Sequence, residues 1–175
     1  MSRTLCFVVA LCFCLMCDGM TQCDICHRVR RTMSELEKLK YQGKELERCS
    51  ESMAEKNISV IPHLEKQNDR IIKLTFDLAS NLFQKNVTNS KWDTKVLQAV
   101  LELLRPEHTG ISDPSPPIDL IKGVHAHFTQ LEDLLSHENF SMCAWETVRM
   151  QVRITLHRFL IRLRQLRARN QGKKE

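Results

Sequence analysis

A long helical stripe near the end of the chain is the feature that most limits the possible folds. Between residues 145 and 166, large apolar residues recur every three or four positions, which is the period of one helix face. They are Trp145, Val148, Val152, Leu156, Phe159, Leu163 and Leu166. Such a stripe has to be covered by other elements. The segment therefore predicts the buried face of a helix in a bundle.

Helical patterns also account for most of the remaining sequence. Only 5 of the 175 residues are glycine, and no Asn-Gly or Asp-Gly hairpin turn lies between segments of alternating apolar and polar residues. We expect helices over residues 24–40, 64–84, 90–106 and from 116 to about 135, in addition to the last one. Ser90 as N-cap with Asp93 at N3 resembles a capping box, and Pro116 suits a first turn. The fold class predicted is all-α: a five-helix bundle with long overhand connections of the up-up-down-down type.

The N-terminal segment reads as an export signal. "MSRTLCFVVALCFCLMCDG" has a short basic start, an apolar run and a small residue after it. We expect a signal peptide over residues 1–22, cleaved between 19 and 23, and one helical domain over 23–175 that is secreted and extracellular. Sequons at Asn57, Asn86 and Asn139 are candidate glycosylation sites.

Four of the eight cysteines lie after this signal: Cys23, Cys26, Cys49 and Cys143. Four cysteines in an oxidising compartment allow three pairings, and their spacing does not choose among them. The formal net charge of +5 is mild and indicates solubility more than nucleic-acid binding.

The last helix has two surfaces besides its apolar stripe. On a helical wheel, Arg149, Arg153, His157 and Arg164 fall beside the stripe, whereas Met150, Ile154 and Ile161 lie nearly opposite to it. Arginine mixed with aliphatic residues is typical of protein interfaces. A solvated face is an equally good reading, because exposed apolar residues are common.

Patterns that would indicate chemistry are weak. "CDIC" has redox or half-zinc-site spacing but lacks a βαβ pattern or a second ligand pair. His125 and His127 would lie about 200° apart on a helix, which favours surface histidines over a metal site. We expect no enzyme activity, no metal and no cofactor.

Two motifs resemble a known family. "CAWETVR" at residues 143–149 is similar to the signature that opens the last helix of type I interferons, and "SKWD" at 90–93 resembles the start of the third helix in fish interferons. Segment order, loop positions and length agree over the mature chain. The chain is identified as a member of the type I interferons, on the fish-like side of the family.

The resemblance implies a cytokine that bridges two class II cytokine receptor chains and triggers JAK-STAT signalling and antiviral defence. It implies a disulfide between Cys49 and Cys143, and receptor contacts at Arg149, Met150, Arg153 and Ile154. An Arg149→Glu change is then expected to abolish signalling and leave the fold intact. We expect a monomer that neither binds nucleic acid nor inserts stably into membranes.

Two departures limit this transfer. Met53 stands where mammalian members carry a receptor-contacting arginine, and no cysteine lies between Cys49 and Cys143 to complete a second bridge. Cys23 and Cys26 are therefore left to pair with each other, to be lost with the signal, or to link two molecules, and the short pair is favoured.

Other functions stay open. The basic run over 162–174 suits a cationic host-defence protein that binds membranes or polyanions, although a solvated helix end explains it more simply. A lambda-type interferon is the nearer alternative.

Overall fold

The computed structural model describes residues 24–41, 47, 49, 58, 61, 68–105 and 115–171. The expected signal peptide, Cys23, Met53 and the sequon at Asn57 lie outside these residues. Within them the chain is helical without any strand. The predicted all-α class is confirmed.

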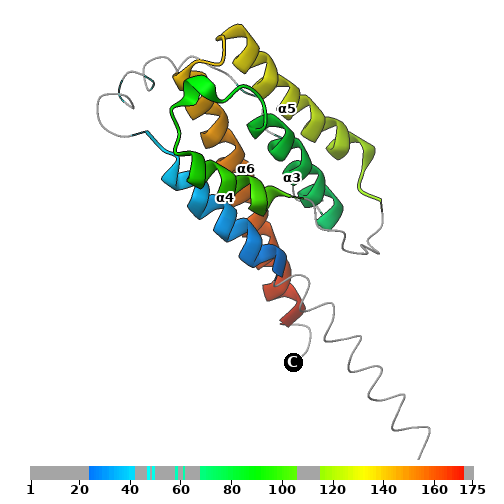
Figure 1. Cartoon of the computed structure of the whole chain (residues 1–175). Coiled ribbons are helices and arrows are strands. Elements are labelled where there is room, and N and C mark those ends of the chain that lie inside the picture. The colour runs from blue at the N-terminus through cyan, green and yellow to red at the C-terminus, as the bar shows by residue number, and fades with distance from the viewer. Residues whose placement is uncertain are drawn as a thin grey trace, which may run out of the picture.

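The described part consists of an N-terminal helix, the four helices α3 to α6 and one short 3-10 turn (Figure 1), and residues 47 and 49 are helical as well. The N-terminal helix covers residues 24–38. It is followed by α3 (Asp69–Phe83), η2 (Thr88–Ser90), α4 (Thr94–Leu104), α5 (Ile118–His137) and α6 (Met142–Gln171). No described helix is long and apolar enough to cross a bilayer.

The helix starts follow from local side-chain chemistry. Asn68 caps α3 by accepting a hydrogen bond from the Ile71 N–H, and the Asp93 carboxylate caps α4 by accepting from Lys95 and Val96 at 2.9 and 3.0 Å. These side chains satisfy backbone donors that have no partner inside the helix.

The predicted capping role of Ser90 is wrong. Ser90 ends η2, and its hydroxyl donates to the Val87 carbonyl at 2.6 Å and accepts from the Trp92 N–H at 3.3 Å. Lys91 then takes a left-handed conformation, φ 55°, which turns the chain so that Asp93 reaches the cap position. Pro117, not Pro116, occupies the N-cap of α5.

A single core fills the bundle and draws on every helix. The predicted stripe of α6 lies in it as far as it is described, with Trp145, Val148, Val152, Leu156 and Phe159 fully buried, while the side chain of Leu166 is outside the described ones. Leu163 is buried as well. Burial of each such side chain contributes roughly 1.5–3 kcal/mol.

Helix directions set the neighbours of α6. The N-terminal helix and α3 point the same way, and α6 runs back antiparallel to the N-terminal helix along its side (Figure 1). The turn at residues 138–141 joins α5 to α6, and α5 also packs against α3. One flank of α6 therefore meets the N-terminal helix, and the other meets α5.

Candidate functional site

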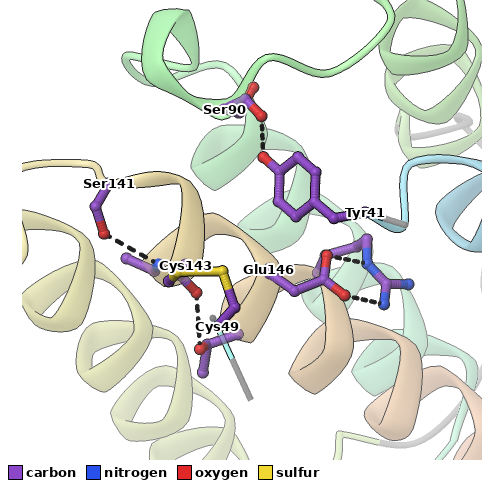
Figure 2. Close-up of a disulfide and its surroundings, with 9 residues drawn as sticks. Tyr41, Cys49, Ser90, Ser141, Cys143 and Glu146 are labelled. Atoms are coloured by element: carbon purple, nitrogen blue, oxygen red, sulfur yellow. Dashed lines mark hydrogen bonds and ion pairs between the residues drawn. A yellow bond between two sulfur atoms is a disulfide. The ribbon is translucent and has the colours of Figure 1, made fainter. Parts of the chain in front are cut away.

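The start of α6 is covalently tied to the first long connection. Cys143 forms a disulfide with Cys49, whose side chain is fully buried, with the two Cα atoms 4.9 Å apart (Figure 2). This is the pairing that the resemblance implied. The Ser141 hydroxyl accepts a hydrogen bond from the Ala144 N–H at 3.2 Å, which caps the helix next to the disulfide.

An aromatic cluster holds the same helix end to the α3–α4 connection. The Trp145 ring lies 5.4 Å from Trp92 and 6.1 Å from Phe83, measured between centroids. Its indole N–H donates to the Asn86 carbonyl at 3.2 Å, and the Tyr41 hydroxyl donates to the Ser90 carbonyl. These bonds satisfy the polar atoms of Trp145 and Tyr41, whereas the buried indole N–H of Trp92 has no hydrogen-bond partner among the described residues. The first turns of α6 are thus fixed from two sides.

Arg149 is not on the outer surface, and the expectation that placed it there is wrong. Its side chain is only 4% exposed. The guanidinium donates two parallel hydrogen bonds to the Glu146 carboxylate, at 2.9 and 2.7 Å, and a third to the Leu36 carbonyl at 3.1 Å. Figure 2 shows the paired contacts of Glu146, which is itself 1% exposed. The bidentate pair neutralises both charges inside the protein, and the third bond reaches the end of the N-terminal helix.

Arg153 lies one turn further along, where the flank of α6 opens to solvent. Its Nε is 3.0 Å from an oxygen of Glu37 on the N-terminal helix, but the N–H does not point at that oxygen, so the contact is an ion pair without a hydrogen bond. Glu37 is also 3.7 Å from Arg149. Since the Arg153 side chain is 42% exposed, the pair leaves much of the guanidinium available to another molecule.

The outer face of α6 agrees with the helical wheel in its other positions. Met150 and Ile154 are half-buried, and Ile161 is 42% exposed. His157 and Arg158 are exposed. A mixture of partly exposed aliphatic and cationic side chains is typical of protein interfaces. We call Met150, Arg153 and Ile154 the α6 contact set.

A polar cavity of about 550 Å³ lies between α3 and α4. Its lining includes Asp77, Gln84, Gln98, Glu102 and Arg105. Burial raises the pKa of Asp77 above 3.8, and Lys73 and Arg28 oppose this shift by favouring the ionised form. Among the described residues, no cluster of side chains has the make-up of a metal site.

The remaining predicted residues are distributed over other parts of the molecule. Asn86 and Asn139 are exposed in the turns before α4 and α6, where a glycan could be attached. Cys26 is buried in the core at 3% exposure. His127 is not a surface histidine as expected: it is 3% exposed, and its Nε2 lies 3.4 Å from the Thr155 hydroxyl of α6.

Sequence reasoning missed the roles of Glu146 and Arg28. Glu146 stands three positions before Arg149, a spacing that brings side chains together on a helix and could have indicated the pair. Arg28 donates from Nε to the Leu103 carbonyl at 2.7 Å, also donates to the Arg105 carbonyl, and covers the Phe76 ring. No local pattern indicated these contacts, because they join residues far apart in the sequence.

Comparison with known proteins agrees with this architecture. The model of the interferon alpha/beta domain matches residues 61–167. Interferon beta of Tachyglossus aculeatus aculeatus is 26% identical over 83 residues, which cover 42% of this chain and 44% of that relative, so the match spans less than half of the relative's length. The structure of zebrafish interferon 2 superposes with a TM-score of 0.57 at 17% identity, covering 77% of this chain and 96% of the other, and supports the fold. Because the domain match extends over more than half of the sequence, the chain belongs to the interferon alpha/beta family, the type I interferons.

Proposed function

We propose that this interferon is a secreted cytokine that bridges two class II cytokine receptor chains and thereby switches on JAK-STAT signalling and an antiviral state. Membership of the family supports a cytokine role. The observation that carries the proposal further is the α6 contact set, a partly exposed surface of Met150, Arg153 and Ile154. Export by cleavage of residues 1–22 and glycosylation at Asn57, Asn86 and Asn139 belong to the same proposal.

The α6 contact set suits a receptor because its backbone is held rigidly before binding. The disulfide and the aromatic cluster fix the start of the helix, and the Glu146–Arg149 pair fixes the next turn against the N-terminal helix. A preorganised surface loses less conformational freedom on association, which leaves more of the contact energy as affinity. Arg149 supports receptor binding by holding α6 in position, and it is not one of the residues that we expect to touch the receptor.

Glu37 makes Arg153 the most informative position to change. The free protein already holds the guanidinium near a carboxylate, so a receptor carboxylate would meet an arginine with restricted motion. Truncating an interface hot spot costs about 2 kcal/mol or more, and arginine is enriched among hot spots. Such a loss corresponds to roughly a thirtyfold weaker affinity.

The experiment compares Arg153→Ala and Ile154→Ala with Lys95→Ala, an exposed cation on α4. Each purified protein is tested for induction of interferon-responsive genes in cells of the natural host. We expect the first two variants to lose at least tenfold in potency with an unchanged unfolding midpoint, and the control to keep full potency. Wild-type potency of both α6 variants would refute the contact set.

Receptor-null cells separate this proposal from a cationic host-defence protein. A receptor-bridging cytokine should be inactive on cells that lack either receptor chain. Equal antiviral or membrane-damaging potency on those cells, lost only when the basic run over residues 162–174 is deleted, would contradict the proposal and support the alternative.

A further inference from the structure

The charges of α6 are balanced only near the start of the helix. No acidic residue occurs between Glu146 and the end of α6 at Gln171, while seven arginines do. They are Arg149, Arg153, Arg158, Arg162, Arg164, Arg167 and Arg169. The first two are paired with Glu146 and Glu37. Within the described part of the chain, Arg158, Arg162 and Arg164 have no carboxylate partner, so the far half of the helix carries uncompensated positive charge.

The N-terminal helix adds cations to the same end of the molecule. It runs antiparallel to α6 (Figure 1), and the Glu37–Arg153 pair fixes which residues lie opposite one another. Arg30 lies seven positions before Glu37, about two turns away on the same helix face. Two turns beyond Arg153 on α6 is the level of residue 160, between His157 and Arg164. Arg30 is therefore expected beside these side chains.

We call five exposed side chains the basic end: Arg30, Arg31, His157, Arg158 and Arg164. Arg164 and His157 lie on the flank of α6 that faces the N-terminal helix, whereas Arg158 lies about 120° around α6 from Arg164, so the group extends across the outer side of the helix. Two adjacent helices contribute to it, with axes separated by roughly 8–10 Å. The positive potential of such a cluster is larger than that of a single helix end and attracts extended anions.

We propose that the basic end binds a sulfated glycosaminoglycan, a function beyond receptor engagement. Arginine predominates in the cluster, and a guanidinium can bind sulfate oxygens through two parallel hydrogen bonds. A linear polysaccharide carries such groups repeatedly along its length and can cross from one helix to the next. The α6 contact set lies nearer the start of the helix, so the two surfaces are adjacent and not the same.

The composition of the basic end argues against the other polyanions. Membrane-binding amphipathic helices insert an apolar face, but that face of α6 is already used by the core, where Leu156, Phe159 and Leu163 are at most 2% exposed. Single-stranded nucleic acids are commonly bound by stacking on aromatic rings. Among the described residues no Phe, Tyr or Trp side chain is exposed at the basic end, and Phe140, which is half-buried, lies in the turn at the opposite end of α6.

The test uses the secreted, disulfide-bonded protein and immobilised heparin. The variant Arg30→Ser/Arg158→Ser/Arg164→Ser is compared with Arg70→Ser/Lys95→Ser/Lys122→Ser, which removes the same charge from exposed positions on α3, α4 and α5. We expect the first to elute at clearly lower salt and to bind heparan sulfate at least tenfold more weakly, while the control stays within twofold of the wild type. Equal losses in the two variants, or no loss in the first, would overturn the proposal.

A comparison with other anionic ligands tests which chemical class of polyanion the basic end binds. Desulfated heparin, a single-stranded DNA of matched charge and vesicles containing phosphatidylserine should each bind at least tenfold more weakly than heparin. Tighter or equal binding of any of them overturns the assignment to a sulfated polysaccharide.

Signalling provides a readout that keeps this proposal separate from receptor binding. The triple variant of the basic end should retain potency on cells lacking heparan sulfate, because the α6 contact set is unchanged in it. On cells that carry heparan sulfate, wild-type protein should be retained at the surface after washing, and the triple variant should not. Equal retention of both proteins would refute the glycosaminoglycan site even where receptor signalling is intact.

Discussion

Replacing Arg149 by methionine should destabilise the protein severely without touching its exposed surface. The change leaves the Glu146 carboxylate, which is 1% exposed, without its two charged donors, and leaves the Leu36 carbonyl without its side-chain donor. Breaking a buried ion pair from one side costs about 3–5 kcal/mol, because the remaining charge stays buried and uncompensated. For a domain of this size, each kcal/mol lowers the melting temperature by roughly 2–4 °C. We therefore expect the melting temperature to fall by about 6–20 °C.

The cause can be isolated with a double-mutant cycle. The proteins are wild type, Arg149→Met, Glu146→Leu and the double variant, each unfolded in guanidinium chloride with the disulfide intact. Removing both charges lets apolar side chains fill the space, so the double variant should be more stable than Arg149→Met by about 2 kcal/mol or more. An Arg149→Met variant within about 1 kcal/mol of the wild type, or additive losses in the double variant, would refute the role of the buried pair.

The burial of Glu146 beside Arg149 also changes the expected result for Arg149→Glu. That substitution would place a second carboxylate next to the buried Glu146, so it should unfold the protein and not leave the fold intact as the outer-face assignment implied. Loss of signalling by that variant would then report lost structure. Measuring potency per folded molecule, with circular dichroism as the check, distinguishes this from a lost receptor contact.

Three further predictions follow from contacts away from that pair. The Cys49→Ser/Cys143→Ser variant removes the disulfide that joins residues 94 positions apart. It should lose roughly 4–5 kcal/mol of unfolding free energy in the chain-entropy treatment, and an unfolding midpoint equal to that of the wild type would contradict this prediction. Tyr41→Phe removes the buried hydroxyl that donates to the Ser90 carbonyl and should cost about 1–3 kcal/mol by urea denaturation, whereas a neutral result would show that water replaces the bond. Asp77→Asn tests the raised pKa of that carboxyl: because the folded state holds the proton more tightly than the unfolded state, ionisation of Asp77 costs stability as the pH rises above 3.8. The variant should therefore gain stability relative to wild type at pH 7 and lose this advantage at pH 3, and a gain that grows toward pH 3 would contradict the shift.

The helical period predicted the core well because packing acts through regular spacing. Trp145, Val152 and Phe159 could be assigned to the buried face from their positions alone, and all are fully buried. Helix ends were harder, because several side chains compete for the same backbone donors. Ser90 and Asp93 both suit an N-cap, and only the left-handed turn at Lys91 decides between them.

The candidate site was predictable only in part, since exposure depends on neighbouring helices. The wheel places Arg149 and Arg153 on the same flank, yet one is 4% exposed and the other has a side chain that is 42% exposed. What separates them is the end of the N-terminal helix, which covers the first and leaves the second at its edge. That contact joins residues more than a hundred positions apart, so no local pattern in the sequence carries it.

The contacts of the N-terminal helix restrict how this protein can be shortened or tagged. Arg28 donates hydrogen bonds to two backbone carbonyls at the end of α4, and the Leu36 carbonyl accepts a hydrogen bond from Arg149 of α6. The N-terminal helix therefore links two helices that do not follow it directly in sequence. An extension ahead of Asp24 leaves both links intact, whereas proteolytic trimming past Arg28 frees the end of α4. Recombinant forms should therefore tolerate a fusion ahead of Asp24 far better than a deletion of a dozen residues that starts at Asp24.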